Sequence, residues 1–189
     1  MSEAAPFPGP PWILTPAQSA AVDAAAIRAG LPGAAMMETA GRAVAEAIAV
    51  RWPEGPVVVF AGGGNNGGDG LVAARWLHAA GRRVELALFF DPAGSKGDAA
   101  TQWRLVEPLG LPVARIADPD AARRAVAAAR GAACAVDALL GTGLEGDVRE
   151  PIRSAIEALE GSPVPIVAVD GPSGLDGESG RVRGAAARA

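Results

Sequence analysis

The hydrophobic pattern of the chain alternates between two kinds of segment. Short continuous apolar runs, such as residues 56–61 (PVVVFA), are typical of strands buried on both faces of a sheet. Longer segments with apolar residues three and four positions apart, as in residues 32–52, predict amphipathic helices. The predicted strands are residues 56–61, 83–89, 112–116, 133–139 and 164–170, and the predicted helices are residues 16–29, 32–52, 68–80, 95–109, 119–130 and 149–160.

The order of these elements predicts the fold. Two helices come first, and the first of them starts with Thr15 as N-cap and Pro16 at the first helical position. Strand–helix units then repeat, which predicts a three-layer αβα, Rossmann-like α/β domain with a mainly parallel sheet and the two extra N-terminal helices packed on it. The domain is expected over residues 13–189, after a proline-rich leader at residues 1–12 with no structure of its own.

Composition excludes several classes of protein. A chain of 189 residues with 50% hydrophobic residues can bury the core of one domain. The net charge of −4, without clustered basic residues, argues against a nucleic-acid partner. No apolar run approaches the ~20 residues needed to cross a bilayer, and the N-terminus lacks a secretory signal. We therefore expect a cytoplasmic protein that binds neither nucleic acid nor membrane.

Candidate chemistry begins directly after the first predicted strand, in residues 61–70 (AGGGNNGGDG). A glycine-rich segment between a buried strand and a helix leaves backbone N–H groups free to converge on an anion, and the helix N-terminus adds positive potential. The spacing is neither the GxGxxG dinucleotide fingerprint nor a Walker loop. The simpler alternative is a flexible connector or an Asn-Gly turn.

Two further loops follow predicted strands and combine an aspartate with glycines. Residues 137–147 start at Asp137, and residues 170–177 start at Asp170 and include Ser173. Taken singly, each aspartate could only be stabilising a turn. Taken together, three such loops at the carboxyl ends of parallel strands would meet in one crevice, which is where open sheets of this class bind ligands.

The motifs, in their order along the chain, resemble the NAD(P)H-hydrate epimerase family. They are Met37-Glu38-Thr39-Ala40-Gly41, GGGNNGGDG, VDALLGTG and DGPSGLDGESG, and the resemblance covers about residues 13–183. Proteins of this family often form the N-terminal half of a two-domain enzyme whose other half is an ADP- or ATP-dependent hydrate dehydratase.

The resemblance implies a metabolite-repair enzyme. It would epimerise the R and S forms of hydrated NADH and NADPH at C6, so that a dehydratase domain, fused or separate, can restore the cofactor. It also implies a homodimer, one K⁺ per subunit held by Asn66, Asp137 and Ser173, and Asp170 as the acid/base catalyst at the nicotinamide end. The residues implied to line the hydrated dinucleotide are Asn65, Asn66, Gly67, Gly68, Asp69, Gly141, Thr142, Gly143, Leu144, Glu145, Gly146, Asp147 and Asp170.

These implied roles agree with the chemistry of the residues. Amide, carboxylate and hydroxyl oxygens are suited to a hard cation. Epimerisation at a carbon that carries a hydroxyl next to a nitrogen needs a proton donor for the departing hydroxyl and a base when it returns, and one carboxyl group can serve as both.

The sequence departs from the family pattern at three places. Thr39 stands where the family usually has Asn, and Gly171 stands where it usually has a β-branched apolar residue. The family also continues with further strands, so we expect a fragment or a shortened copy without the dehydratase half.

Two functions other than that of an epimerase are also considered: a non-catalytic nucleotide-binding or protein-interaction module on the same scaffold, or an enzyme with another nucleotide substrate. The absence of a Walker lysine argues against the latter.

Overall fold

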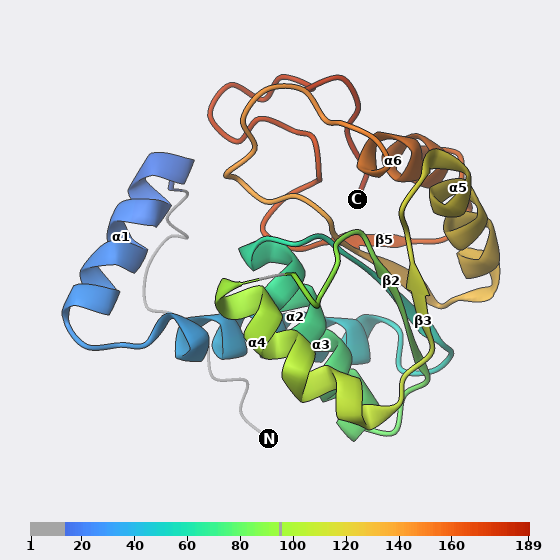
Figure 1. Cartoon of the computed structure of the whole chain (residues 1–189), viewed down its shortest axis with the longest axis horizontal. Coiled ribbons are helices and arrows are strands. Elements are labelled where there is room, and N and C mark those ends of the chain that lie inside the picture. The colour runs from blue at the N-terminus through green and yellow to red at the C-terminus, as the bar shows by residue number, and fades with distance from the viewer. Residues whose placement is uncertain (1–13, 95) are drawn as a thin grey trace.

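The computed structural model describes residues 14–94 and 96–189 (Figure 1). The proline-rich leader at 1–12 and the predicted helix start at residue 95 therefore lie outside the described residues. The helices are α1 (Pro16–Arg28), α2 (Gly33–Arg51), α3 (Asn65–Ala79), α4 (Gly97–Val106), α5 (Pro119–Ala128) and α6 (Ile152–Glu160), with 3-10 turns η1 (Glu107–Leu109) and η2 (Ala129–Gly131). The strands are β1 (Val57–Ala61), β2 (Val84–Leu88), β3 (Val113–Arg115), β4 (Cys134–Ala138) and β5 (Ile166–Ala168).

The described strands form one sheet in the order β3-β2-β1-β4-β5, and every pairing is parallel. The predicted α/β Rossmann-like class is thereby confirmed. The chain moves outward from β1 to β3 and then returns to place β4 on the other side of β1. Such a reversal opens a crevice at the carboxyl ends of the two strands, so the topology itself locates a candidate site beside β1 and β4.

Alternate residues of β1 enter two separate cores. Val57 and Val59 pack with α2, α3 and α4 on one face of the sheet, whereas Val58 and Phe60 pack with α5 and α6 on the other. Because both faces of the central strands are covered, β1 and β4 are buried along their whole lengths. This explains why β1 is a continuous apolar run and why Asp137 is the one polar residue of β4.

Helix α1 starts as predicted, with Thr15 and Gln18 forming a reciprocal capping box and Pro16 in the first turn. Its position differs from the prediction. None of its residues is buried by the described part of the chain, and in Figure 1 it stands at one side of the layered body. The second helix, α2, does pack on the sheet, through Ala45 and Ile48. Only one of the two N-terminal helices therefore covers the core.

The edge strands are shorter than their apolar runs predict. β3 and β5 each have three residues, against predicted runs at 112–116 and 164–170. Each pairs with a neighbour on one side only. β3 pairs with three of the five residues of β2, and β5 pairs with three of the five residues of β4. Asp170 lies two residues beyond β5. No helix in residues 14–94 and 96–189 is long and apolar enough to cross a membrane.

Candidate functional site

The segments after β1 and β4 are in direct contact at the point where the strand order reverses. The N–H of Gly62 donates to the carbonyl of Ala138 at 3.0 Å. A Cβ added at Gly62 would lie only 2.0 Å from the carbonyl oxygen of Leu139. The two loops singled out from the sequence are therefore neighbours, as the topological argument requires.

The glycine-rich segment is only partly a loop. Helix α3 begins at Asn65, three residues before the predicted start, and so residues 65–70 form its first turns. A Cβ on Gly67 would lie 1.8 Å from the carbonyl oxygen of Gly62, and one on Gly68 would lie 2.6 Å from the Met37 side chain. These glycines let a helix end pack tightly against backbone and α2. The loop part of the glycine-rich segment is thus confined to residues 62–64.

The N-terminus of α3 keeps its capacity to bind an anion. The first N–H groups of any α-helix lack acceptors within the helix, and the helix dipole adds positive potential there. Gly64 occupies the N-cap and no side chain caps this end. Glycine at this position also leaves open space, because a Cβ on Gly64 would meet nothing within 4 Å.

Asn66 points an unpaired amide into the protein. The residue is 8% exposed, and neither its Oδ1 nor its Nδ2 has a hydrogen-bond partner among the described residues. Buried amide atoms are satisfied in the great majority of cases, so such a group indicates a missing ligand, ion or water. The Oδ1 and Nδ2 atoms of Asn66 are therefore the atoms of this crevice that most clearly indicate a bound ligand, ion or water.

Asp137 and Ser173 form a buried pair close to the same crevice. Asp137 has no exposed surface, and its carboxylate accepts hydrogen bonds from Ser173 Oγ (2.5 Å) and Ser173 N (2.8 Å). Ser173 Oγ also contacts the backbone N–H (2.9 Å) and carbonyl (3.0 Å) of Leu140. Burial raises the pKa of Asp137, and the hydrogen bonds from Ser173 oppose this by favouring the charged form.

Asp170 faces the crevice from the loop after β5. Its φ is 66°, the left-handed region that a non-glycine residue enters at a cost of about 1–3 kcal/mol. The carboxylate accepts a hydrogen bond from Thr142 N at 3.0 Å. A Cβ on Gly141 would lie 3.0 Å from Asp170 Oδ2 and 3.2 Å from Asn66 Cβ. Gly141 therefore separates the Asp170 carboxylate from the buried amide of Asn66 by about the width of one side chain.

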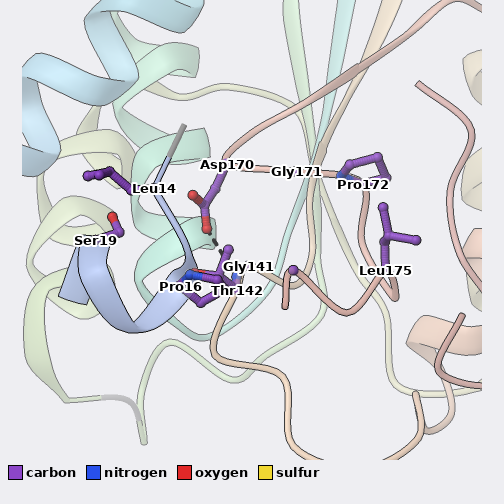
Figure 2. A pocket seen from close by; sticks show the side chains of 10 residues that line it. Leu14, Pro16, Ser19, Gly141, Thr142, Asp170, Gly171, Pro172 and Leu175 are labelled. Carbon is purple, nitrogen blue, oxygen red and sulfur yellow. Dashed lines mark hydrogen bonds between the residues drawn. The ribbon is translucent and has the colours of Figure 1, made fainter. Parts of the chain in front are cut away.

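A pocket of about 290 Å³ opens at the Asp170 carboxylate (Figure 2). Gly141 and Thr142 from the β4 loop and Asp170 to Pro172 from the β5 loop form one side of it. The start of α1 closes the other side, and Figure 2 shows Ser19 and Leu14 there opposite Asp170. This volume is at the lower end of the range for small-molecule sites, so it is suited to one ring of a ligand rather than to a dinucleotide.

Asp69, in the first turns of α3, also has a raised pKa. Burial, followed by the negative charges of Asp170 and Asp23, raises its pKa to about 7. Asp23 comes from α1 and was not singled out from the sequence, nor was Ser19. No sequence pattern could have found them, because the approach of α1 to the crevice depends on the loop that joins it to α2.

The remaining predicted site residues lie around this centre. Asn65 is exposed at the first position of α3. Residues 143–147 continue outward from Thr142, and none of them lines the pocket around Asp170. Leu144 is half-buried against the α5–α6 core, whereas Gly143, Glu145, Gly146 and Asp147 are exposed. The structure thus brings Asn66, Gly141, Thr142 and Asp170 together and leaves residues 143–147 outside the pocket lining.

Comparison with known proteins adds independent information. A family model described as the YjeF-related protein N-terminus matches residues 33–189. The NAD(P)H-hydrate epimerase of Pirellula staleyi is 40% identical over 91% of this chain and 76% of its own length. The bifunctional NAD(P)H-hydrate repair enzyme Nnr of Salinibacter ruber is 42% identical over 95% of this chain. The crystal structure of yeast ynu0 superposes with a TM-score of 0.78, at 27% identity, over 87% of this chain and 72% of that one.

The chain spans about a third of the bifunctional relatives, since it covers 35% of the Salinibacter enzyme and 33% of its Methanothermobacter thermautotrophicus counterpart. The family match includes α2, every strand of the sheet, and the three loops that meet at its carboxyl edge. The resemblance found in the sequence motifs is therefore confirmed by comparisons that use the whole domain. With this sheet order, these loops and this identity, the chain belongs to the YjeF-related N-terminal family.

Proposed function

We propose that the chain is an NAD(P)H-hydrate epimerase that interconverts the R and S forms of hydrated NADH and NADPH at C6. One observation supports this most: a carboxylate, Asp170, held in a strained conformation at the mouth of a ring-sized pocket. The buried, unpaired amide of Asn66 lies on the other side of Gly141. The relative from Pirellula staleyi is named an NAD(P)H-hydrate epimerase, and the one from Salinibacter ruber is named a bifunctional NAD(P)H-hydrate repair enzyme.

The size of the pocket suggests how the substrate would lie. The hydrated nicotinamide ring would occupy the pocket at Asp170, between Thr142 and α1. The pyrophosphate would then reach the open N-terminus of α3, where Asn65, Asn66, Gly67 and Gly68 begin the helix and Asp69 follows. The rest of the dinucleotide would extend along the predicted contact residues 141–147.

Asp170 is proposed as an acid/base catalyst. The hydroxyl at C6 departs as water once it is protonated, and the ring nitrogen provides the electron pair that replaces the broken C–O bond. Return of water to the other face of the ring, with loss of a proton to a carboxylate, completes the epimerisation. The hydrogen bond from Thr142 N fixes the orientation of the Asp170 carboxylate.

The residues of the crevice also fit the proposed K⁺ ion. Asn66 Oδ1 is buried without a partner, and Asp137 supplies the one full negative charge of the proposed ligand set. Ser173 adds a hydroxyl oxygen, and this hydroxyl is hydrogen-bonded to the Asp137 carboxylate. A donor set with a single carboxylate suits a monovalent ion better than a divalent one, which usually recruits more carboxylates. When bound, the ion would supply positive charge that stabilises ionised Asp137 and holds the β1, β4 and β5 loops together.

The proposed epimerase would act together with a second enzyme in the cell. The product would pass to an NAD(P)H-hydrate dehydratase, fused or separate, and the reaction would take place in the cytoplasm.

A homodimer is proposed to cover α1, because Val22 is 56% exposed and Ile27 is 53% exposed on a helix that buries no residue within the described chain. Sedimentation of a Val22→Asp, Ile27→Asp double variant as a monomer, against a wild-type dimer, would test this interface.

The decisive experiment is a turnover assay. The R and S hydrates of NADH are separated chromatographically, and each is incubated with the protein in KCl at neutral pH. We expect conversion of either isomer into a mixture well above the uncatalysed rate. Asp170→Asn should bind NAD⁺ within a few-fold of wild type and lose about 10²–10⁴ in rate. Binding without turnover by the wild type would instead support the non-catalytic module.

A further inference from the structure

A second carboxyl group, that of Asp69 on α3, has no role in the mechanism proposed for Asp170. Asp69 is half-buried at a position three residues after Asn66. Side chains three residues apart share one face of a helix, so Asp69 lies on the same face of α3 as Asn66. Asn66 lies beside Gly141, which in turn lies beside Asp170. The buried, unpaired amide of Asn66 on this face indicates that a ligand belongs here.

Helix α1 brings a third carboxylate to the same place. Ser19 lines the pocket opposite Asp170, and Asp23 follows it by four residues on the same face of α1. Asp23 is close enough to Asp69 to act on its charge, as is Asp170. The three groups come from α1, α3 and the loop after β5, so they meet only in the folded chain.

Within residues 14–94 and 96–189, no cation or hydrogen-bond donor stabilises the ionised form of the Asp69 carboxyl group. No described residue donates a hydrogen bond to its carboxyl group, and the two charges that act on it, those of Asp170 and Asp23, are both negative. The carboxyl is also removed from water, which disfavours its charged form. Asp69 therefore keeps its proton to higher pH than an ordinary aspartate does, beside the carboxylate of Asp170.

Resting on the proposed epimerase function, we propose that Asp69 and Asp170 form a catalytic pair that holds one proton, with Asp69 as the acid and Asp170 as the base. Asp69 gives its proton to the C6 hydroxyl, the C6–O bond breaks, and the ring nitrogen forms a double bond to C6 with its lone pair. Water then adds to C6 from the other face and gives its surplus proton to Asp170. Transfer of that proton to Asp69, directly or through water, restores the starting state.

The arrangement has an electrostatic benefit besides proton transfer. When water leaves C6, the ring becomes a cation. The negative charges of Asp23, Asp170 and the newly ionised Asp69 then surround it and stabilise it, because this charge develops in a site that is partly withdrawn from water. Asp23 acts through Asp69 and the ring charge, and is therefore a positioning residue rather than an acid or a base.

The test combines kinetics with direct titration of the carboxyl groups. We expect Asp69→Asn to lose about 10²–10⁴ in epimerisation rate, while NAD⁺ binding stays within a few-fold of wild type. The wild-type rate should fall as pH rises through about 7, the pKa of Asp69. Asp23→Asn should move this fall to lower pH, a shift that a purely structural role of Asp23 would not produce. Asp120→Asn, an exposed residue of α5 on the other face of the sheet, is the matched control and should change neither the rate nor its pH dependence.

Titration by ¹³C NMR of aspartate-labelled protein gives a readout that does not depend on activity. The Asp69 carboxyl should titrate near 7 in the wild type and at lower pH in both Asp170→Asn and Asp23→Asn. An active wild type whose Asp69 titrates near 4, or an Asp69→Asn variant with near-normal turnover, would overturn the pair alone. A wild type that does not accelerate epimerisation would instead overturn the proposed function itself.

Discussion

Ser173 donates both its hydroxyl and its backbone N–H to the fully buried carboxylate of Asp137, at 2.5 and 2.8 Å. This contact joins the loop after β5 to the end of β4, over a separation of 36 residues in sequence. The same hydroxyl contacts the backbone of Leu140, one residue before the glycine that separates Asn66 from Asp170. A pair of residues outside the pocket therefore determines where the pocket residues lie.

Ser173→Ala should lower the free energy of unfolding by about 1–3 kcal/mol, because it leaves a buried carboxylate with one fewer donor. Urea denaturation at pH 7 measures this loss. Ser162→Ala is the matched control, since the Ser162 hydroxyl only accepts a long 3.4 Å contact from Val164 N. Equal midpoints for the two variants would mean that the Asp137–Ser173 pair does not stabilise the fold.

The pH dependence of stability should report Asp69. Its pKa is raised from 3.8 to about 7 in the folded chain, so folding favours the protonated form. The contribution of this group is fully present below about pH 4 and is lost as pH rises through about 7. After allowance for solvent screening, we expect a loss of about 1–2 kcal/mol between these limits relative to Asp69→Asn. Parallel stability curves for the two proteins would contradict the shift.

Gly67 should not tolerate any side chain. An alanine Cβ there would lie 1.8 Å from the carbonyl oxygen of Gly62, so the start of α3 would have to move. We expect Gly67→Ala to cost about 3 kcal/mol or more, at the upper end for single substitutions. Gly64→Ala is the control, because its Cβ would meet nothing within 4 Å and its φ is −96°. Thermal melts of both variants measure the difference, and similar melting temperatures would refute the packing explanation.

Gly141→Ala should impair the site more than the fold. Its Cβ would lie 3.0 Å from Asp170 Oδ2 and 3.2 Å from Asn66 Cβ, so the two side chains would have to separate by a few tenths of an ångström. We expect about a tenfold weaker binding of NAD⁺, equivalent to 1.4 kcal/mol, with a melting temperature close to that of wild type. Gly131→Ala, in the turn η2 before β4 and with open space around its Cβ, should bind normally. Calorimetric titration distinguishes the two variants.

Potassium should stabilise the folded chain selectively. A ligand that binds only the folded state adds RT ln(1 + [L]/Kd), about 2.7 kcal/mol at a hundredfold excess over Kd. Melting temperatures should therefore rise in KCl above those in NaCl or LiCl at the same ionic strength. Asn66→Leu, which removes the unpaired amide while keeping its size, should abolish the difference. An equal response of the wild type to all three salts would remove the ion from the proposal.

The sequence alone determined the elements whose causes are local. A continuous apolar run identified β1, and a run interrupted only by Asp137 identified β4, since both faces of these strands are covered. Thr15 with Pro16 identified the start of α1. The parallel sheet followed from the alternation of strands and helices, and the crevice followed from the loops at the strand ends. Asp137, Ser173 and Asp170 could be named in advance because each lies at or just after the end of a predicted strand.

The tertiary structure decided everything that depends on approach between distant segments. The start of α3 moved to Asn65 because its glycines permit packing against Gly62 and Met37, and no local pattern encodes those neighbours. The placement of Asp23 beside Asp69 depends on the path of the chain between α1 and α2. Hydrophobic period reports which side of an element is buried, whereas a contact between two elements depends on how the whole sheet orders and orients them.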